Sequence, residues 1–169
     1  MIERERTFIA KSLPIQLKSC NKKQIIDVYI PGKDGMAQLR ARKKGDNYEL
    51  TKKVPLQEGN NAVQAETTIP INQEEFDYLY TYLPCKIKKE RYEYQENTII
   101  YEIDIFQGHL SGLALVDVEF EEERQMNNFI PPKFLGKEVT HDKKFAWGIL
   151  CQTSEKKIKS MLMKQKSHS

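Results

Sequence analysis

The sequence has no long apolar run: no stretch approaches the roughly 20 apolar residues that a membrane-spanning helix needs. Its first ten residues, MIERERTFIA, are charged where a signal peptide has its apolar segment. We therefore expect a cytoplasmic protein that has no membrane partner.

Cysteine and histidine are scarce. Three Cys and three His are spread over 169 residues, with no Cys-x-x-Cys pair, which favours buried or half-buried thiols over zinc binding or redox chemistry. No motif near the histidines resembles a nucleophile with its base. A Walker-type loop is also missing, because Gly32-Lys33-Asp34-Gly35 lies between two strand-like runs and predicts a hairpin turn. These absences argue against triad chemistry, zinc binding and P-loop nucleotide binding.

The composition is that of a single soluble domain, with 39% hydrophobic and 30% charged residues. The formal charge of +3 is unevenly distributed. Residues 155–169 hold five Lys and one Glu, which leaves 22 basic and 23 acidic residues in the rest of the chain. We expect a main domain over residues 1–153, of net charge near zero, and a basic helix or tail over 154–169. A nearly neutral main domain makes nucleic acid an unlikely partner.

Most of the sequence alternates between apolar and polar residues in short runs, the pattern of antiparallel strands. The predicted strands are residues 2–9, 25–31, 36–43, 47–54, 62–70, 86–94, 98–106, 112–120 and 143–151. Short helices are predicted at 12–19, from Asn72 onward, at 121–128 and at 154–165. Asn72 and Glu75 have the spacing of a capping box. The predicted fold class is α+β, mainly β.

Charges of the same sign recur two residues apart in these strands, and residues at that spacing point to the same face. The pairs are Glu3 and Glu5, Arg40 and Arg42, Lys89 and Arg91, Glu102 and Asp104, and Asp117 and Glu119. A solvated face explains any single pair. It explains five such pairs poorly, because pairing between strands favours opposite charges beside each other, so a solvated face should mix both signs. A closed barrel would direct all five pairs into one interior, where carboxylates suit a hard divalent cation and Arg or Lys suits phosphate.

An ordered series of motifs supports this interpretation. Its members are Glu3-Arg4-Glu5, Arg40-Ala41-Arg42, Thr51-Lys52-Lys53, Lys89-Glu90-Arg91, Glu102-Ile103-Asp104, Asp117-Val118-Glu119 and a closing segment, 135–145, that contains Lys144. The series resembles the triphosphate tunnel metalloenzymes, also called the CYTH superfamily, from about residue 2 to residue 150.

The resemblance implies a closed antiparallel barrel of about eight strands with a few short flanking helices. Its tunnel would bind a triphosphate with Mg²⁺ or Mn²⁺, and the most direct reaction is hydrolysis of inorganic tripolyphosphate to pyrophosphate and phosphate. The implied metal ligands are Glu3, Glu5, Glu102, Asp104, Asp117 and Glu119. The implied substrate-binding residues are Arg40, Arg42, Lys53, Lys89, Arg91 and Lys144. The candidate general base is Glu66 or another carboxylate of the tunnel.

The sequence departs from the family pattern at a few positions. Thr7 stands where the family usually has Lys, Ala62 and Gln64 stand where Arg and Glu are common, and Asp117 replaces a glutamate. Other activities on the same scaffold stay open, namely thiamine triphosphatase and class IV-type adenylate cyclase. So does a non-catalytic module that binds polyphosphate or nucleotide. A homodimer is compatible with the sequence.

Overall fold

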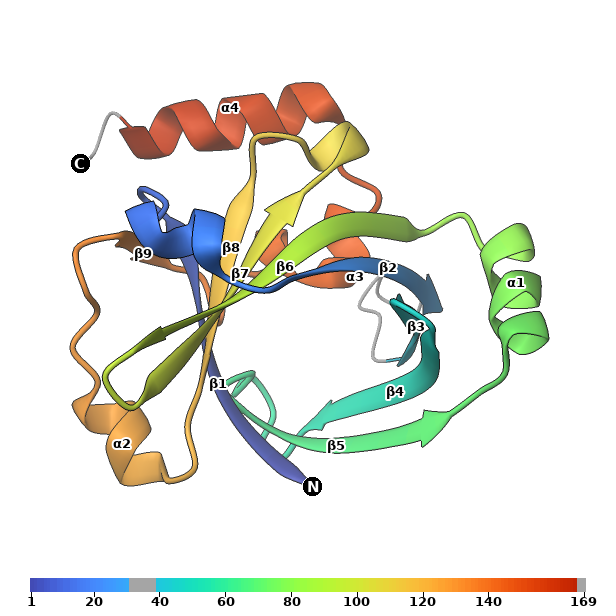
Figure 1. The fold of residues 1–169 in the computed structure, drawn as a ribbon, viewed down its shortest axis with the longest axis horizontal. Helices are drawn as coiled ribbons and strands as arrows, with labels where there is room; N and C mark the ends of the chain where they lie inside the picture. Colours follow the sequence, from blue (N-terminus) through green and yellow to red (C-terminus); the bar gives the residue numbers. More distant parts are fainter. Residues whose placement is uncertain (31–38, 167–169) are drawn as a thin grey trace.

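The computed structural model describes residues 1–30 and 39–166, and in this part of the chain nine strands form one antiparallel sheet (Figure 1). The strands are β1 (Ile2–Ala10), β2 (Lys22–Ile30), β3 (Leu39–Lys44), β4 (Asn47–Pro55), β5 (Val63–Pro70), β6 (Lys86–Glu96), β7 (Ile99–Phe106), β8 (Ala114–Glu119) and β9 (Leu135–Glu138). Eight of them match predicted strands. The predicted hairpin turn at 32–35 lies outside the described residues.

Closure of the sheet depends on β1, which has a neighbour on both edges. The strand order runs β5-β4-β3-β2-β6-β7-β8-β1, and the first residues of β1 also pair with β5, for example Glu3 with Gln64. Farther along, that same edge of β1 pairs with β9. Eight strands therefore close the barrel and β9 is an addition, which confirms the predicted fold class.

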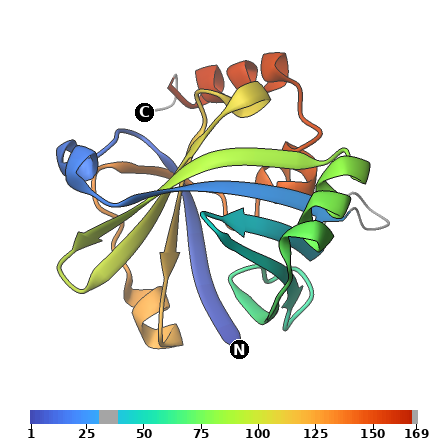
Figure 2. The ribbon, with the colours of Figure 1, turned by 45° about the vertical axis from the view of Figure 1, so that its right-hand side comes forward.

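Helices lie mainly outside this barrel (Figures 1 and 2). They are α1 (Gln73–Tyr82), α2 (Glu123–Asn128), α3 (Trp147–Leu150) and α4 (Glu155–Lys166), with 3-10 turns η1 (Ile15–Ser19), η2 (Gly108–Leu110) and η3 (Lys143–Phe145). The predicted capping box at Asn72 and Glu75 is present at the start of α1. Phe76 of α1 packs on Val28 and Ala41 of the barrel wall. No helix among the described residues is long and apolar enough to cross a membrane.

The predicted strand at 143–151 is wrong. This segment forms η3 and α3, and the side chain of Asp142 starts the turn by accepting a hydrogen bond from the Lys144 N–H at 3.1 Å. The edge of β1 that a ninth strand could use is already taken by β9. The apolar residues of 143–151 are instead buried in turns, where Phe145 and Leu150 join the core.

The expectation of free thiols is wrong for two of the three cysteines. Cys85 and Cys151 form a disulfide, with a Cα–Cα distance of 5.3 Å across a sequence separation of 66 residues. Cys151 ends α3, so the pair forms only because that segment folds back against the start of β6. Cys20 is unpaired and half-buried.

The interior of the barrel has two different ends. One end is filled by an apolar core that includes Ile9, Ile87, Phe106 and Leu115, together with side chains from the C-terminal segment such as Ile158 of α4. At the other end the same strands continue with charged residues. The strand alternation predicted from the sequence is thus confirmed, and it places the charges inside.

Candidate functional site

A cavity of about 210 Å³ opens at the charged end of the barrel. Ten of the thirteen residues predicted from the sequence line it: Glu3, Glu5, Arg40, Arg42, Lys53, Glu66, Arg91, Glu102, Asp117 and Glu119. They come from strands β1, β3, β4, β5, β6, β7 and β8, so the barrel closure brings together residues that are up to 116 positions apart. Among the residues that the structure describes, seven carboxylates and five cationic side chains line this cavity.

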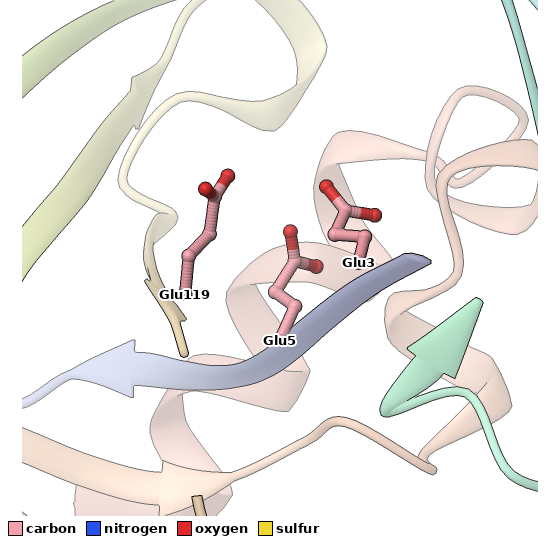
Figure 3. A group of neighbouring side chains, drawn as sticks. All are labelled: Glu3, Glu5 and Glu119. Atoms are coloured by element: carbon pink, nitrogen blue, oxygen red, sulfur yellow. The ribbon is translucent and has the colours of Figure 1, made fainter. Parts of the chain in front are cut away.

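The carboxylates of Glu3, Glu5 and Glu119 form a cluster in which each residue offers an oxygen within 4.8 Å of the others. Figure 3 shows the three side chains projecting from β1 and β8 into one space. Burial and the adjacent Glu5 raise the pKa of Glu3 to about 7, and burial with repulsion from Glu102 and Glu5 also raises the pKa of Glu119. Such mutual repulsion is what a bound cation would relieve.

Lys53 lies among these carboxylates. Its Nζ is 2.5 Å from Glu3 Oε2, 3.4 Å from Glu66 Oε2 and 3.7 Å from Glu5 Oε2. Burial tends to lower the pKa of Lys53, but the negative charges of Glu5 and Glu3 outweigh it and raise the pKa. Burial has the opposite tendency for Glu66, whose pKa is nevertheless lowered by the Lys53 ammonium. Lys53 is therefore a fixed positive charge facing the cluster.

Arginines from β3 and β6 supply the basic wall of the cavity. Arg42 donates to both carboxylate oxygens of Asp27, at 2.7 and 2.9 Å, and Arg91 does the same to Asp104, at 2.7 Å each. Arg91 also contacts Glu102 and, at 3.3 Å, Asp117. The Nε of Arg40 is buried and has no hydrogen-bond partner among the described residues. Bidentate pairing fixes the guanidinium planes, since both atoms of one edge are held.

Thr7 of β1 contacts Asp117 of β8. The Thr7 hydroxyl donates a hydrogen bond of 2.9 Å to Asp117 Oδ1. Asp117 is buried, and burial together with repulsion from Glu5 raises its pKa to about 8.

Three predicted site residues do not line the cavity: Lys89, Asp104 and Lys144. Lys89 and Asp104 are fully buried and pair with one another at 2.5 Å. Burial tends to raise the pKa of Asp104, but the charges of Arg91 and Lys89 bring it to about 2. Lys144 is exposed on η3, because the segment that contains it turns instead of forming a strand.

A second cavity, of about 150 Å³, adjoins the first and shares Glu5, Arg40, Lys53 and Trp147 with it. Its other lining residues include apolar side chains such as Val139 and Phe145. The predicted site residues are all charged, so Trp147 is not among them. Three other residues of the charged cavity were not predicted either: Lys44, Glu49 and Thr68. Each lies two positions from a motif residue on the same strand, namely Arg42, Thr51 and Glu66, and this spacing could have indicated them.

The fold and the cavity together define a class of protein: a closed eight-stranded antiparallel barrel with acidic and basic clusters facing each other inside. The family model of the CYTH domain matches residues 1–129, and the chain belongs to this family.

Two curated relatives are both named inorganic triphosphatase. The one from Nitrosomonas europaea is 34% identical over 148 residues, which cover 86% of this chain and 93% of the relative. The one from Acetivibrio thermocellus is 30% identical over 123 residues, covering 72% and 76%. A crystal structure of an inorganic triphosphatase superposes with a TM-score of 0.65 at 29% identity, over 89% of this chain and 95% of that one.

Proposed function

We propose that this protein is a metal-dependent triphosphatase that hydrolyses inorganic tripolyphosphate to pyrophosphate and phosphate inside the barrel. The observation that carries the proposal is the three-glutamate cluster facing Arg40, Arg42, Arg91 and Lys53 across one cavity. The names of the two curated relatives support the same reaction.

The donor set fits a hard divalent cation. Glu3, Glu5 and Glu119 offer only carboxylate oxygens, the ligands that Mg²⁺ and Mn²⁺ prefer, and one oxygen of each lies within 4.8 Å of the others. When bound there, Mg²⁺ or Mn²⁺ would neutralise phosphate oxygens and lower the pKa of a coordinated water. We propose Glu102 and Asp117 as further acidic neighbours of that site.

The basic residues would hold the phosphates. Arg40, Arg42 and Arg91 present planar groups suited to pairs of phosphate oxygens, whereas Lys53 acts as a point charge. Phosphoryl transfer to water depends mainly on positioning and charge neutralisation, so residues held this rigidly suit the reaction.

Glu66 is our proposed general base. The Lys53 ammonium lowers its pKa, so its carboxylate is ionised at neutral pH and able to accept a proton from water. A low pKa also makes it a weak base. Glu3, with its pKa at about 7, is the competing candidate, and the pH–rate profiles of Glu66→Gln and Glu3→Gln distinguish them.

The test measures phosphate released from tripolyphosphate by the wild type with Mg²⁺ or Mn²⁺ and with EDTA. We expect metal-dependent release, and a loss on the order of 100-fold in Glu5→Gln, because this change removes one ligand charge. Glu74→Gln, an exposed change on α1, is the matched control and should retain wild-type rates.

Three results would contradict the proposal: no release by the wild type, equal rates in EDTA, or an unaffected Glu5→Gln variant. ATP and thiamine triphosphate are assayed in parallel. If ATP or thiamine triphosphate is hydrolysed faster than tripolyphosphate, that compound is the substrate. Tight binding of tripolyphosphate without release of phosphate would indicate a non-catalytic module.

A further inference from the structure

A line of buried charges lies beneath the cavity and connects its two bidentate arginines. Arg42 pairs with Asp27, whose Oδ2 is 3.9 Å from the Nζ of Lys89. The same Nζ is 2.5 Å from Asp104 Oδ2, and Asp104 in turn pairs with Arg91. Arg42 and Arg91 line the cavity, whereas the three residues between them do not. Lys89 is therefore the central link between two aspartate–arginine pairs.

Lys89 is buried against two aromatic rings, one of which lines the cavity. Its side chain is 0% exposed, and its Nζ lies 4.4 Å from the ring centroid of Trp147 and 5.7 Å from that of Phe106. Trp147 itself lines the cavity. To contact a phosphate, the ammonium would have to leave Asp104 and displace the indole, which would forfeit a buried ion pair and a cation–π contact.

Lys89 places a positive charge between the two aspartates. Asp27 and Asp104 are both fully buried on neighbouring parts of the barrel wall, and one ammonium placed between them offsets part of the negative charge that each retains beside its arginine. Each aspartate holds one edge of a guanidinium, so the other edge faces away from it. Asp27 thus orients Arg42, and Asp104 orients Arg91 together with Glu102 and Asp117.

We propose that Lys89 is a positioning residue, which orients Arg42 and Arg91 for the polyphosphate through Asp27 and Asp104 and does not contact the substrate itself. This inference rests on the proposed function, because it assigns a role to Lys89 in binding at that same cavity.

A double-mutant cycle tests it, with tripolyphosphate binding measured by calorimetry in EDTA. Lys89→Met should weaken binding by about 10- to 100-fold, the usual effect of removing an outer-shell partner. In an Arg91→Gln background the same change should cost only about 3- to 10-fold, because only the share of the effect that passes through Arg42 remains. Lys88→Met is the control, since Lys88 is exposed on the opposite face of β6, and it should stay within about twofold of wild type.

A crystal structure of the wild type with tripolyphosphate gives a second measurement that needs no variant to fold. We expect Lys89 Nζ still on Asp104 beneath Trp147. A phosphate oxygen within hydrogen-bond distance of that nitrogen would overturn the inference, as would fully additive losses in the cycle. If the wild type binds normally and the losses add, only the role of Lys89 is wrong. If the wild type does not bind tripolyphosphate, the proposed function fails and the inference fails with it.

Discussion

The two ends of the barrel interior are built by the same strands and differ in what neutralises or fills them. At one end Ile9, Leu115 and Phe106 pack against each other and against the C-terminal segment. On each of these three strands, the residue two positions away faces the same interior but belongs to a charged network. These residues are Thr7, Asp117 and Asp104. At the apolar end, removing side chains from water stabilises the folded state. At the charged end, carboxylates repel each other unless positive charges neutralise them. One end therefore stabilises the fold and the other is poised for a ligand.

The largest expected effect is at the apolar end. Leu115→Ala removes a side chain that is fully buried in the core, and we expect the free energy of unfolding to fall by about 3–4 kcal/mol through lost burial and a residual cavity. Urea denaturation measures this change. A loss below about 1 kcal/mol would mean that the apolar end contributes little to the stability of the barrel.

Reduction of the disulfide should weaken the same end. Cys85 and Cys151 join the start of β6 to the end of α3, and opening a link that closes a loop of 66 residues should cost about 3 kcal/mol. Thermal unfolding with and without a reductant measures it, and Cys85→Ser/Cys151→Ser should behave like the reduced wild type without responding to the reductant. Cys20→Ser is the matched control, because Cys20 is unpaired.

At the charged end, pH should change stability. Burial and Glu5 raise the pKa of Glu3 to about 7 and that of Asp117 to about 8. Folding therefore takes up protons, and the stability linked to these groups is complete below pH 4 and lost as pH rises through about 7 and 8. In EDTA we expect unfolding to become easier by about 2 kcal/mol between pH 5 and pH 9. Saturating Mg²⁺ should remove most of this slope, and a flat profile in EDTA would contradict the assigned repulsion.

The smallest expected effect is an increase in the stability of the fold, whereas the other changes lower it. Glu5→Gln removes one of the charges that raise the pKa of Glu3 and Asp117, so in EDTA it should stabilise the fold by about 1 kcal/mol, although with metal it lowers activity on the order of 100-fold. Thermal unfolding of this variant beside Glu74→Gln measures the difference. A destabilised Glu5→Gln would mean that the contact between Glu5 and Lys53 outweighs the repulsion.

Much of the barrel and of its lining could be predicted because strand alternation is local. Once Arg40 and Arg42 lie on one strand, the period of two assigns them to one face regardless of the other strands. The ordered motifs then indicated the CYTH family, and ten predicted residues line the cavity. The disulfide, the turn at η3 and the burial of Lys89 could not be predicted this way, because each depends on where the segment after β9 packs.

The sequence by itself determined which residues share a face, because that follows from backbone geometry within each strand. It also determined that charges of one sign gather on each of these strands, which indicated an interior binding site. Only the tertiary structure decided which charges reach the cavity and which lie beneath it. Lys89 and Arg91 are two residues apart and on the same face, yet Trp147 covers only the first. That difference arises from the contact of Lys89 with Trp147, which lies 58 residues away in the sequence. A pattern within one strand cannot predict such a contact.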